Sequence, residues 1–556
     1  MSELSRRERE VLADLDRWWA DHLDEFVADL VAWVRVPSVS RSDQAAPGAP
    51  FGPDVAAIFD LVRSRAADLG FRAVDHEGFA LSVIGDPQGP EPQGPAEQGS
   101  ESALGLGEQG QKQQEPEGSE LGLVSHLDVV AAGRGWTLPP FEATVRDGFV
   151  VGRGTADNKG AALVDLYLLR FLRDARIGLE HPIRVVYGGA EEVDMADLRH
   201  YAETAPLPVL SLITDGPFPV NHAQKGGLDI DITTGVGSTL AGLSVGTHRA
   251  EVPAVASIDL DAAALGAAAD PATRAPDSAD MDARVSASTG VPKLKQPPRG
   301  RLEIVAGAAG SSLVAYGVGG HSAFPETGIL NAIGVLAAGL LDNGLVRGAD
   351  LAAANMLATV LADCYGSRLG VARSDDDSGP LTYNGGIVRS DGRVLRLELA
   401  VRYPVTADID EVIADFVTAL EPFGATVTAR PSRPPVHVSR ADPRVQLLQA
   451  AFRDVTGLDV PPIAMGGGTH ARVLPRSITF GPGLTFARQA AGLSPGRRPD
   501  FIPADHGLTH GPDEFVDLAD LHQAFRVWVT ALQRLDDFLE SKSSFTRETN
   551  GETNKA

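Results

Sequence analysis

The stretch LGLVSHLD, residues 121–128, places a histidine and an aspartate directly after an apolar run. Short β-branched runs bounded by Gly or Pro are typical of buried strands. The same arrangement recurs three times, with the runs 149–154, 183–187 and 209–213 followed by Asp157, the pair Glu191-Glu192, and Asp215. In open α/β sheets ligands bind beyond the carboxyl ends of the strands, so side chains from several strand ends can meet there. The sequence therefore predicts an α/β fold with a polar cluster at the strand exits.

The residue types in this cluster indicate metal chemistry. A histidine with several carboxylates and no cysteine is a ligand set for zinc or manganese. Two metals that share a carboxylate would make a hydrolytic site. Taken singly, an Asp at a strand end is more often a turn former or helix N-cap, and a Glu-Glu pair is usually a solvated surface. The joint occurrence, in order and always at a strand exit, favours the metal interpretation.

Composition sets the broad class of protein. The 556 residues suit two domains, and the formal net charge of −25 makes nucleic acid an improbable partner. The only cysteine, Cys364, excludes an intramolecular disulfide and fits a reducing cytoplasm. The N-terminus lacks an apolar signal core, and no apolar run reaches the ~20 residues of a membrane span. We expect a soluble cytoplasmic protein without a nucleic-acid or membrane partner.

Apolar spacing and composition predict the organisation of the chain. Apolar positions at helical spacing predict helices at 11–36, 53–69, 160–174, 328–342 and 408–420, and one starting near 442. Residues 87–119 are rich in Pro, Gly, Gln and Glu and are predicted to be a disordered insertion. Residues 267–299 are predicted to be a loop, and residues 541–556 a disordered tail.

Seven motifs, in order, resemble one known family. They are HLDVV (126–130), GRGTADNKG (152–160), GAEE (189–192), TDG (214–216), GGHS (319–322), GGGTHAR (466–472) and HGPDE (510–514). The chain resembles the aminoacylase/carboxypeptidase type of co-catalytic zinc peptidase, which includes acetylornithine deacetylase, succinyl-diaminopimelate desuccinylase and glutamate carboxypeptidase. The DNKG form and the GGGT-x-AR segment make it most similar to the Xaa-His or carnosinase-like bacterial dipeptidases. The resemblance covers nearly the whole chain.

The resemblance also implies a domain plan. A catalytic domain with a mixed central sheet flanked by helices would comprise residues 1–217 and 438–540. An inserted α+β lid domain would occupy residues 218–437, roughly twice the length that one small α+β sandwich needs. We therefore expect a lid of two ferredoxin-like halves. Because the second half could take the place of a partner chain, we also expect a monomer.

Carried over position by position, the resemblance implies five metal ligands. Asp157 would bridge two divalent ions, His126 and Asp215 would complete one site, and Glu192 with His510 the other. The ions would be zinc, with manganese or cobalt as alternatives. A bridging carboxylate holds two cations ~3.5–4 Å apart, and the ions lower the pKa of the water between them. A metal-bridging hydroxide would then be available near neutral pH.

Three further residues are expected to take part in catalysis. Glu191 would be the general base that takes a proton from the water and returns it to the leaving amine. Asp128 would orient the His126 imidazole through its other ring nitrogen. His321, from the lid, would donate a hydrogen bond to the tetrahedral oxyanion.

Two arginines are candidates for binding the terminal carboxylate of the substrate. Arg472 follows Gly468 and Thr469, whose backbone amides can approach an anion closely. Arg402 ends a predicted lid strand. A planar guanidinium matches a carboxylate bidentately. Arg472 is the favoured candidate.

Three positions near these motifs leave questions open. The role of His470 is uncertain, because related dipeptidases often carry Tyr there. His506 is interpreted as a non-ligand, because only His510 has the following Gly-Pro-Asp-Glu. Ala250 stands where relatives commonly show an Asn that helps to bind substrate, which leaves the specificity open.

The leading hypothesis is a metal-dependent dipeptidase that hydrolyses short unblocked peptides. The alternative is an N-acyl amino acid deacylase of the acetylornithine deacetylase or succinyl-diaminopimelate desuccinylase type. A non-catalytic binding protein with a degenerate site is a third hypothesis. The presence of Glu191 and all five expected ligands argues against it.

Overall fold

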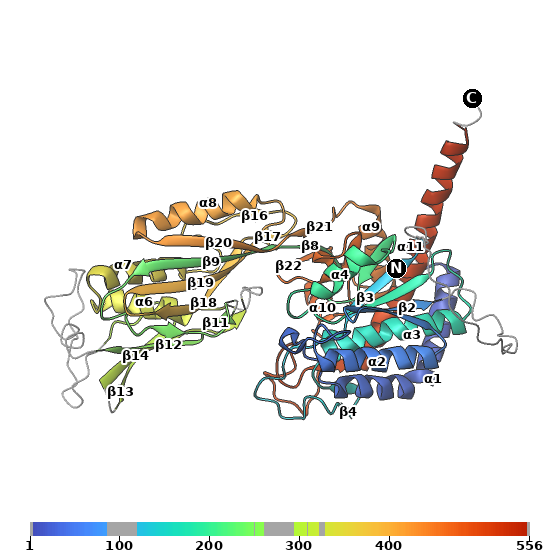
Figure 1. Ribbon diagram of the computed structural model, residues 1–556, viewed down its shortest axis with the longest axis horizontal. Helices are drawn as coiled ribbons and strands as arrows, with labels where there is room; N and C mark the ends of the chain where they lie inside the picture. Colours follow the sequence, from blue (N-terminus) through green and yellow to red (C-terminus); the bar gives the residue numbers. More distant parts are fainter. Residues whose placement is uncertain are drawn as a thin grey trace, which may run out of the picture. The chain divides into compact units, whose positions relative to one another are not determined.

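The computed structural model describes residues 4–85, 119–249, 251–260, 294–307, 310–321 and 328–552. The chain divides into two compact units (Figure 1). The first comprises Met1–His222, Val438–Ile463 and Thr469–Ala556, and the second Ala223–His437 and Ala464–Gly468. Nearly all of the predicted insertion 87–119, most of the predicted loop 267–299, and Ala250 lie outside the described residues.

The first unit is built on a mixed central sheet. The strand order is β1 (Arg72–His76), β2 (Ala80–Gly85), β6 (Ile183–Gly188), β3 (Leu121–His126), β7 (Leu210–Ile213), β23 (Ser477–Phe480) and β8 (Val220–Gln224). The four strands β6, β3, β7 and β23 run parallel, whereas β1, β2 and β8 pair antiparallel at the two sides. This arrangement confirms the predicted mixed α/β sheet.

Helices cover the sheet because its strands are apolar on both faces. In β3, Leu123 belongs to the large core and Val124 to a smaller one, as the alternation of a strand requires. The large core also holds residues of α1 (Arg6–Arg35), α2 (Pro53–Asp68), α3 (Gly160–Asp174), α9 (Pro443–Thr456) and α11 (Leu518–Glu552). The smaller core holds Leu198 and Tyr201 of α4 (Ala196–Thr204). The unit also contains α10 (Thr485–Ala490) and η1 (Ser42–Gln44).

Helix starts follow recognisable capping residues. Ser5 and Glu8 form a capping box at the start of α1, and the Asp442 side chain accepts from the Arg444 amide at the start of α9. The predicted helices at 11–36, 53–69 and 160–174, and the one starting near 442, are present as α1, α2, α3 and α9.

The secondary structure at the end of the chain differs from what the sequence predicted. Residues 541–552 continue helix α11 to Glu552, where a disordered tail was expected (Figure 1). Extending a helix that is already nucleated and packed needs no new nucleus, so a polar sequence can continue it. Among the described residues, no helix is both long and apolar enough to cross a bilayer.

A separate three-stranded sheet corrects another expectation. The run 149–154 forms β5 (Phe149–Val151), which pairs with β4 (Thr144–Arg146) and β24 (Phe515–Asp517) and does not join the central sheet. Asp157 follows β5 in the turn η2 (Thr155–Lys159). Asp157 therefore does not follow a strand of the central sheet, unlike the other predicted strand-exit residues.

The second unit contains two larger antiparallel sheets. One has the order β10 (Ser244–Val245), β18 (Thr382–Ser390), β19 (Val394–Tyr403), β9 (Gly226–Gly235) and β20 (Thr426–Arg433). The other has the order β12 (Val255–Leu260), β14 (Gly310–Tyr316) and β13 (Arg301–Gly307). One apolar core includes residues of both sheets and of α6 (Ala332–Asp342), α7 (Gly348–Val360) and α8 (Ile409–Leu420). The helices expected at 328–342 and 408–420 are present as α6 and α8.

Short elements complete the second unit. They are the pairs β11 (Glu251–Val252) with β15 (Gly320–His321) and β16 (Ser374–Asp375) with β17 (Gly379–Pro380), together with η5 (Glu421–Phe423). The last two residues of β8 pair with β21 (Val436–His437). A further short strand, β22 (Ile463–Met465), pairs with β8.

Candidate metal centre

The predicted ligands come together in the first unit as two groups that share one residue. His126, Asp157 and Asp215 form one group, and Asp157, Glu192 and His510 form the other. Within each group the candidate ligand atoms all lie within 4.8 Å of one another. A set of imidazole and carboxylate donors at this spacing suits a divalent ion such as zinc.

The first group lies at the exits of β3 and β7. His126 Nε2 lies 3.0 Å from Asp157 Oδ1 and 3.8 Å from Asp215 Oδ2. His126 Nδ1 donates to the Asp128 backbone carbonyl at 3.0 Å, which leaves Nε2 to face the two carboxylates. The tautomer set by this hydrogen bond is the one that a metal bound through Nε2 requires.

The second group lies between the turn after β6 and the loop before β24. His510 Nε2 lies 3.1 Å from Glu192 Oε1 and 3.3 Å from Asp157 Oδ2. His510 has a φ of 63°, a backbone conformation that is uncommon for a residue with a side chain. Asp157 thus offers Oδ1 to one histidine and Oδ2 to the other, which fits a bridging ligand.

The acidic side chains of the cluster favour a bound cation. Burial, together with Asp157, raises the pKa of Asp215 to about 6 and that of Glu192 to about 7, against the opposing effect of nearby histidines. Burial and the neighbouring carboxylates, Asp215 first, also raise the pKa of Glu191 well above its usual range. Crowded buried carboxylates cannot all ionise unless positive charge compensates them. Divalent ions at the two groups would supply that charge.

The Asp128 side chain contacts both His126 and the Glu191-Glu192 turn. Its carboxylate oxygens accept from the backbone amides of Glu191 at 3.1 Å and Glu192 at 3.0 Å. Oδ1 lies 3.3 Å from His126 Nδ1, farther than the Asp128 backbone carbonyl that accepts from that nitrogen. Asp128 therefore holds the Glu191-Glu192 turn with its side chain, and both its carboxylate and its backbone carbonyl face His126 Nδ1.

Two residues that hold the backbone next to the candidate ligands were not singled out from the sequence. The Glu514 carboxylate, fully buried, accepts from the backbone amides of Gly154, Ala156 and Asp157 at 3.0–3.1 Å. Asn158 accepts from the His126 amide at 3.3 Å and donates to the Thr214 carbonyl at 3.0 Å. Both lie within quoted motifs, DNKG and HGPDE, but their partners are distant in sequence. Spacing alone could not reveal these contacts.

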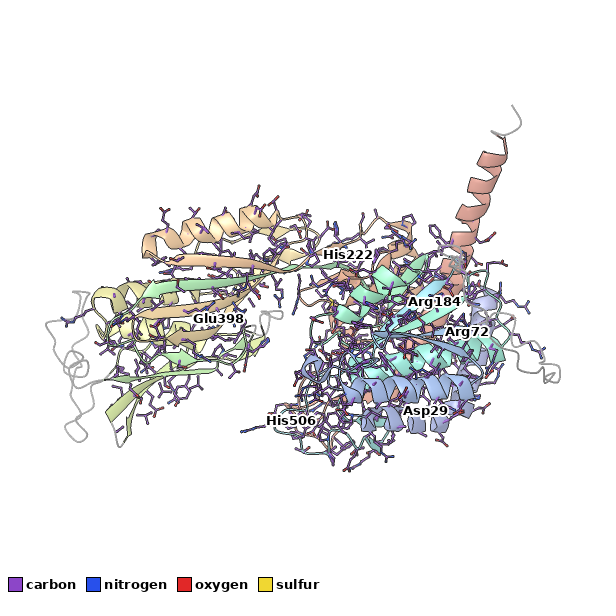
Figure 2. All side chains as sticks on the ribbon, in the orientation of Figure 1. Asp29, Arg72, Arg184, His222, Glu398 and His506 are labelled. Atoms are coloured by element: carbon purple, nitrogen blue, oxygen red, sulfur yellow. The ribbon has the colours of Figure 1, made fainter. Side chains whose placement is uncertain are left out.

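His506 lies outside the two groups that share Asp157. His506 belongs to the first unit, where Figure 2 labels it. Its Nδ1 donates to Asp513 Oδ2 at 2.7 Å, and Asp513 also accepts from the backbone amides of Thr137 and Leu138. His506 is therefore engaged in fixing the loop that carries His510.

The remaining predicted residues are divided between the two units. Thr469 and Arg472 belong to the first unit, where the Thr469 hydroxyl accepts from the Ala471 amide at the start of η6 (His470–Arg472). Gly468, Arg402 and His321 belong to the second. The His321 backbone pairs with Glu251 between β15 and β11, and its side chain lies outside what the structure describes.

Arg402 is buried at the end of β19. Its Nη1 donates to the Val401 carbonyl at 3.2 Å, and its Nε has no hydrogen-bond partner in the described part of the chain. Burial, followed by the like charge of Arg433, lowers the pKa of Arg402 to about 10, although Asp229 opposes this effect. A buried guanidinium with so few acceptors suits an anionic ligand.

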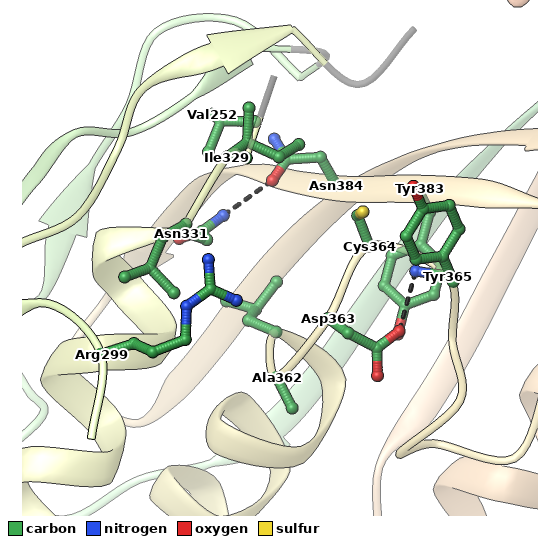
Figure 3. Close-up of a pocket in the computed structure, with 13 residues that line it drawn as sticks. Val252, Arg299, Ile329, Asn331, Ala362, Asp363, Cys364, Tyr365, Tyr383 and Asn384 are labelled. Atoms are coloured by element: carbon green, nitrogen blue, oxygen red, sulfur yellow. Dashed lines mark hydrogen bonds between the residues drawn. The ribbon is translucent and has the colours of Figure 1, made fainter. Parts of the chain in front are cut away.

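A cavity in the second unit is lined in part by polar side chains that already have hydrogen-bond partners. Its polar lining includes Asn331, Asn384 and Asp363 (Figure 3). Asn331 Nδ2 donates to Asn384 Oδ1 at 2.8 Å, and Asp363 accepts from backbone amides of its own loop, including that of Tyr365. These polar groups satisfy each other and the local backbone, so we assign the hydrolytic chemistry to the first unit.

A mixed α/β sheet with two histidine–carboxylate groups that share one aspartate is typical of metal-dependent hydrolases. The family described as peptidase family M20/M25/M40 matches residues 122–534 of this chain. The chain belongs to this peptidase family.

Individual relatives span nearly its whole length. "Putative dipeptidase YtjP" of Bacillus subtilis strain 168 is 27% identical over 516 residues, covering 92% of this chain and 97% of that protein. "Putative dipeptidase SSP1012" of Staphylococcus saprophyticus is 23% identical over 529 residues, covering 93% and 99%. The crystal structure of human carnosine dipeptidase 1 matches with a TM-score of 0.50 at 13% identity, covering 96% of this chain and 99% of that one. This structural likeness concerns the fold alone.

Proposed function

We propose that this chain is a metal-dependent dipeptidase that hydrolyses short unblocked peptides and holds two divalent ions, of which zinc is the first choice. The observation that carries the proposal is the placement of Asp157, with one carboxylate oxygen toward His126 and the other toward His510. Membership of the peptidase family and the dipeptidase names of its relatives support the same reaction class.

Different side chains of the first unit would bind the ions and transfer the proton. His126 and Asp215 would hold one ion, Glu192 and His510 the other, and Asp157 both. When bound, the ions supply Lewis-acid polarisation of the scissile carbonyl and lower the pKa of the attacking water. Glu191 accepts the proton of that water and returns it to the leaving amine nitrogen.

We also propose that the second unit is a lid that supplies substrate contacts. His321 would donate a hydrogen bond to the developing oxyanion. Arg472, with Thr469 and Gly468, is the first candidate for the substrate carboxylate. Arg402 is the second candidate, supported by its burial without a carboxylate partner in the described part of the chain. A lid of this length, with two halves, suits a monomer, and the single cysteine suits the cytoplasm.

Substrate trials test the proposal against its alternative. Metal-free protein is supplied with zinc or with manganese and offered matched pairs, such as a dipeptide and the corresponding N-acetyl amino acid. We expect hydrolysis of dipeptides with a kcat/KM at least ~10-fold above that for the N-acyl compounds, because one well-placed polar contact is worth about 1.4 kcal/mol or more. Faster hydrolysis of N-acyl amino acids would instead identify a deacylase.

A further inference from the structure

Two buried carboxylates hold the turn that carries Glu191 and Glu192. Four consecutive backbone amides, of residues 189–192, donate to these carboxylates. Asp197 Oδ2 accepts from Gly189 at 2.8 Å and Ala190 at 2.9 Å, and Asp128 accepts from the next two amides. Amide hydrogen bonds to an ionised carboxylate are stronger than those to a neutral acceptor. The position of the proposed base therefore depends on Asp197 as well as Asp128.

Asp197 is itself paired with His470, 273 residues away in the chain. His470 Nε2 lies 3.0 Å from Asp197 Oδ2 and 3.2 Å from Oδ1, and both side chains are fully buried. His470 Nδ1 has no hydrogen-bond partner among the described residues. Although burial opposes it, His470 and the backbone amides hold the pKa of Asp197 below its usual range.

The end of β6 leaves room for this pair. A Cβ at Gly188 would meet Asp197 Oδ2 at 2.3 Å and His470 Cε1 at 2.5 Å. Gly188 lies opposite His126 in the parallel register of β6 and β3, and the His126 and His470 rings lie 6.3 Å apart edge to face. The pair is therefore packed directly behind the metal centre.

His470 also belongs to the segment proposed to bind substrate. It begins η6, between Thr469 and Arg472, and the Thr469 hydroxyl hydrogen-bonds Thr479 of β23 at 3.0 Å. A shift of this segment would be transmitted through His470 and Asp197 to the amides of the 189–192 turn.

We infer that Asp197 and His470 form a positioning pair that couples the substrate-binding segment 469–472 to the general base Glu191. The inference rests on the proposed hydrolase function. The pair touches neither substrate nor ion in this scheme, and it acts by fixing where the Glu191 carboxylate lies. The expected consequence is that its loss lowers kcat more than it raises KM, because a misplaced base affects the transition state and not substrate binding.

The first variants are Asp197→Asn and His470→Gln in full-length, zinc-loaded protein. Asp194→Asn is the matched control, because Asp194 is exposed and its side chain accepts only the Ala196 amide among the contacts the structure describes. We expect each pair variant to lower kcat roughly 10–100-fold, the usual effect of removing a supporting partner, with KM changed less than about 3-fold and zinc content retained. Asp194→Asn should keep the wild-type kcat.

The decisive readout combines each pair variant with Glu191→Gln. If the pair acts through Glu191, adding Asp197→Asn or His470→Gln to Glu191→Gln should lower the residual kcat less than about 3-fold, because residues that act as a unit are not additive. A further 10-fold loss in that background, or a kcat within 3-fold of wild type for both single variants, would overturn the inference. Use of both variants keeps the test valid if one does not fold. Wild-type protein that hydrolyses no dipeptide would instead refute the proposed function.

Discussion

At the scale of single residues, the chemistry depends on how Asp157 is held. Its two oxygens face different histidines, and its backbone amide donates to Glu514. Removing a carboxylate that serves both ligand groups would affect both ion sites at once. The base, by contrast, can be changed without touching either group, which makes it the sharper probe of mechanism.

Glu191→Gln should lower kcat by roughly 10²–10⁴-fold and leave zinc content unchanged, because the amide keeps the shape but cannot accept the proton. Steady-state hydrolysis of a dipeptide and elemental analysis of the purified protein measure the two quantities. The exposed Glu203→Gln is the matched control and should behave as wild type. Near-normal turnover of Glu191→Gln would refute its assignment as the base.

A second residue-scale prediction concerns pH and stability. Asp165 of α3 is fully buried, and its Oδ2 accepts from the hydroxyls of Ser125 at 3.0 Å and Thr214 at 2.7 Å. Burial raises the pKa of Asp165 to about 8, against these two hydrogen bonds. The folded protein therefore keeps a proton that the unfolded chain releases above about pH 4. The free energy of unfolding should fall as the pH rises from about 4 to 8.

Asp165→Asn removes this proton, so the free energy of unfolding should depend less on pH in this variant. Denaturant unfolding of metal-free protein between pH 5 and 8 measures this effect. The free energy of unfolding of wild type should fall by up to ~1.4 kcal/mol per pH unit relative to that of Asp165→Asn. Asp24→Asn, at an exposed position of α1, should keep the wild-type slope. Parallel pH profiles for wild type and Asp165→Asn would show that Asp165 is ionised in the folded protein.

The sequence indicated which five side chains gather in the two groups that share Asp157, because each follows an apolar strand or lies in a compact motif. It did not reveal Asp197, because an aspartate in the first turn of a helix has an ordinary explanation as a dipole-stabilising residue. Its partners are the turn at 189–190 and His470, and a contact over that separation leaves no local pattern.

At the scale of elements, the η2 turn sets where Asp157, the proposed bridging ligand, lies. Gly154 precedes this turn with a φ of +86°, and a Cβ there would lie 2.6 Å from Val129 Cγ1. Gly148 has a φ of +83° but a Cβ there would come no closer than 3.6 Å to any neighbour. Substitution of either glycine therefore strains the backbone in the same way, but only a side chain at Gly154 would also clash with Val129.

Gly148→Ala should cost about 1–2 kcal/mol of stability from the left-handed backbone alone and leave zinc affinity unchanged. Gly154→Ala should cost more and weaken zinc binding by roughly 10-fold or more, because the clash displaces the turn that carries Asp157. Competition with a zinc chelator and thermal unfolding measure both effects. Equal zinc affinities in the two variants would contradict this role of the turn.

The elements also show where sequence patterns were insufficient. Six helices were predicted closely because their apolar spacing is regular, namely α1, α2, α3, α6, α8 and α9. The apolar run at 149–154 was correctly predicted as a strand, but apolarity does not specify which sheet a strand joins, and β5 pairs with β4 and β24. Helix α11 was not among the predicted helices, and the polar sequence of its last turns does not reveal that a packed helix continues through them.

At the scale of the whole molecule, the proposed monomer requires His321 to serve the active site of its own chain. Mixing Glu191→Gln protein with His321→Ala protein tests this directly. Each parent lacks one function, so activity returns only if the histidine acts on a neighbouring chain. We expect the mixture to show no more than the summed residual activities of the parents. Recovery of dipeptide hydrolysis on mixing would show that His321 crosses between chains.

The central claim is that two ions share Asp157, and a zinc titration tests it most directly. Metal-free protein is titrated with zinc while hydrolysis of a dipeptide is measured after each addition. The shared bridging ligand predicts that the rate rises until two equivalents per chain are bound and is constant thereafter. A plateau at one equivalent, or no hydrolysis at any zinc level in folded protein, would contradict the account.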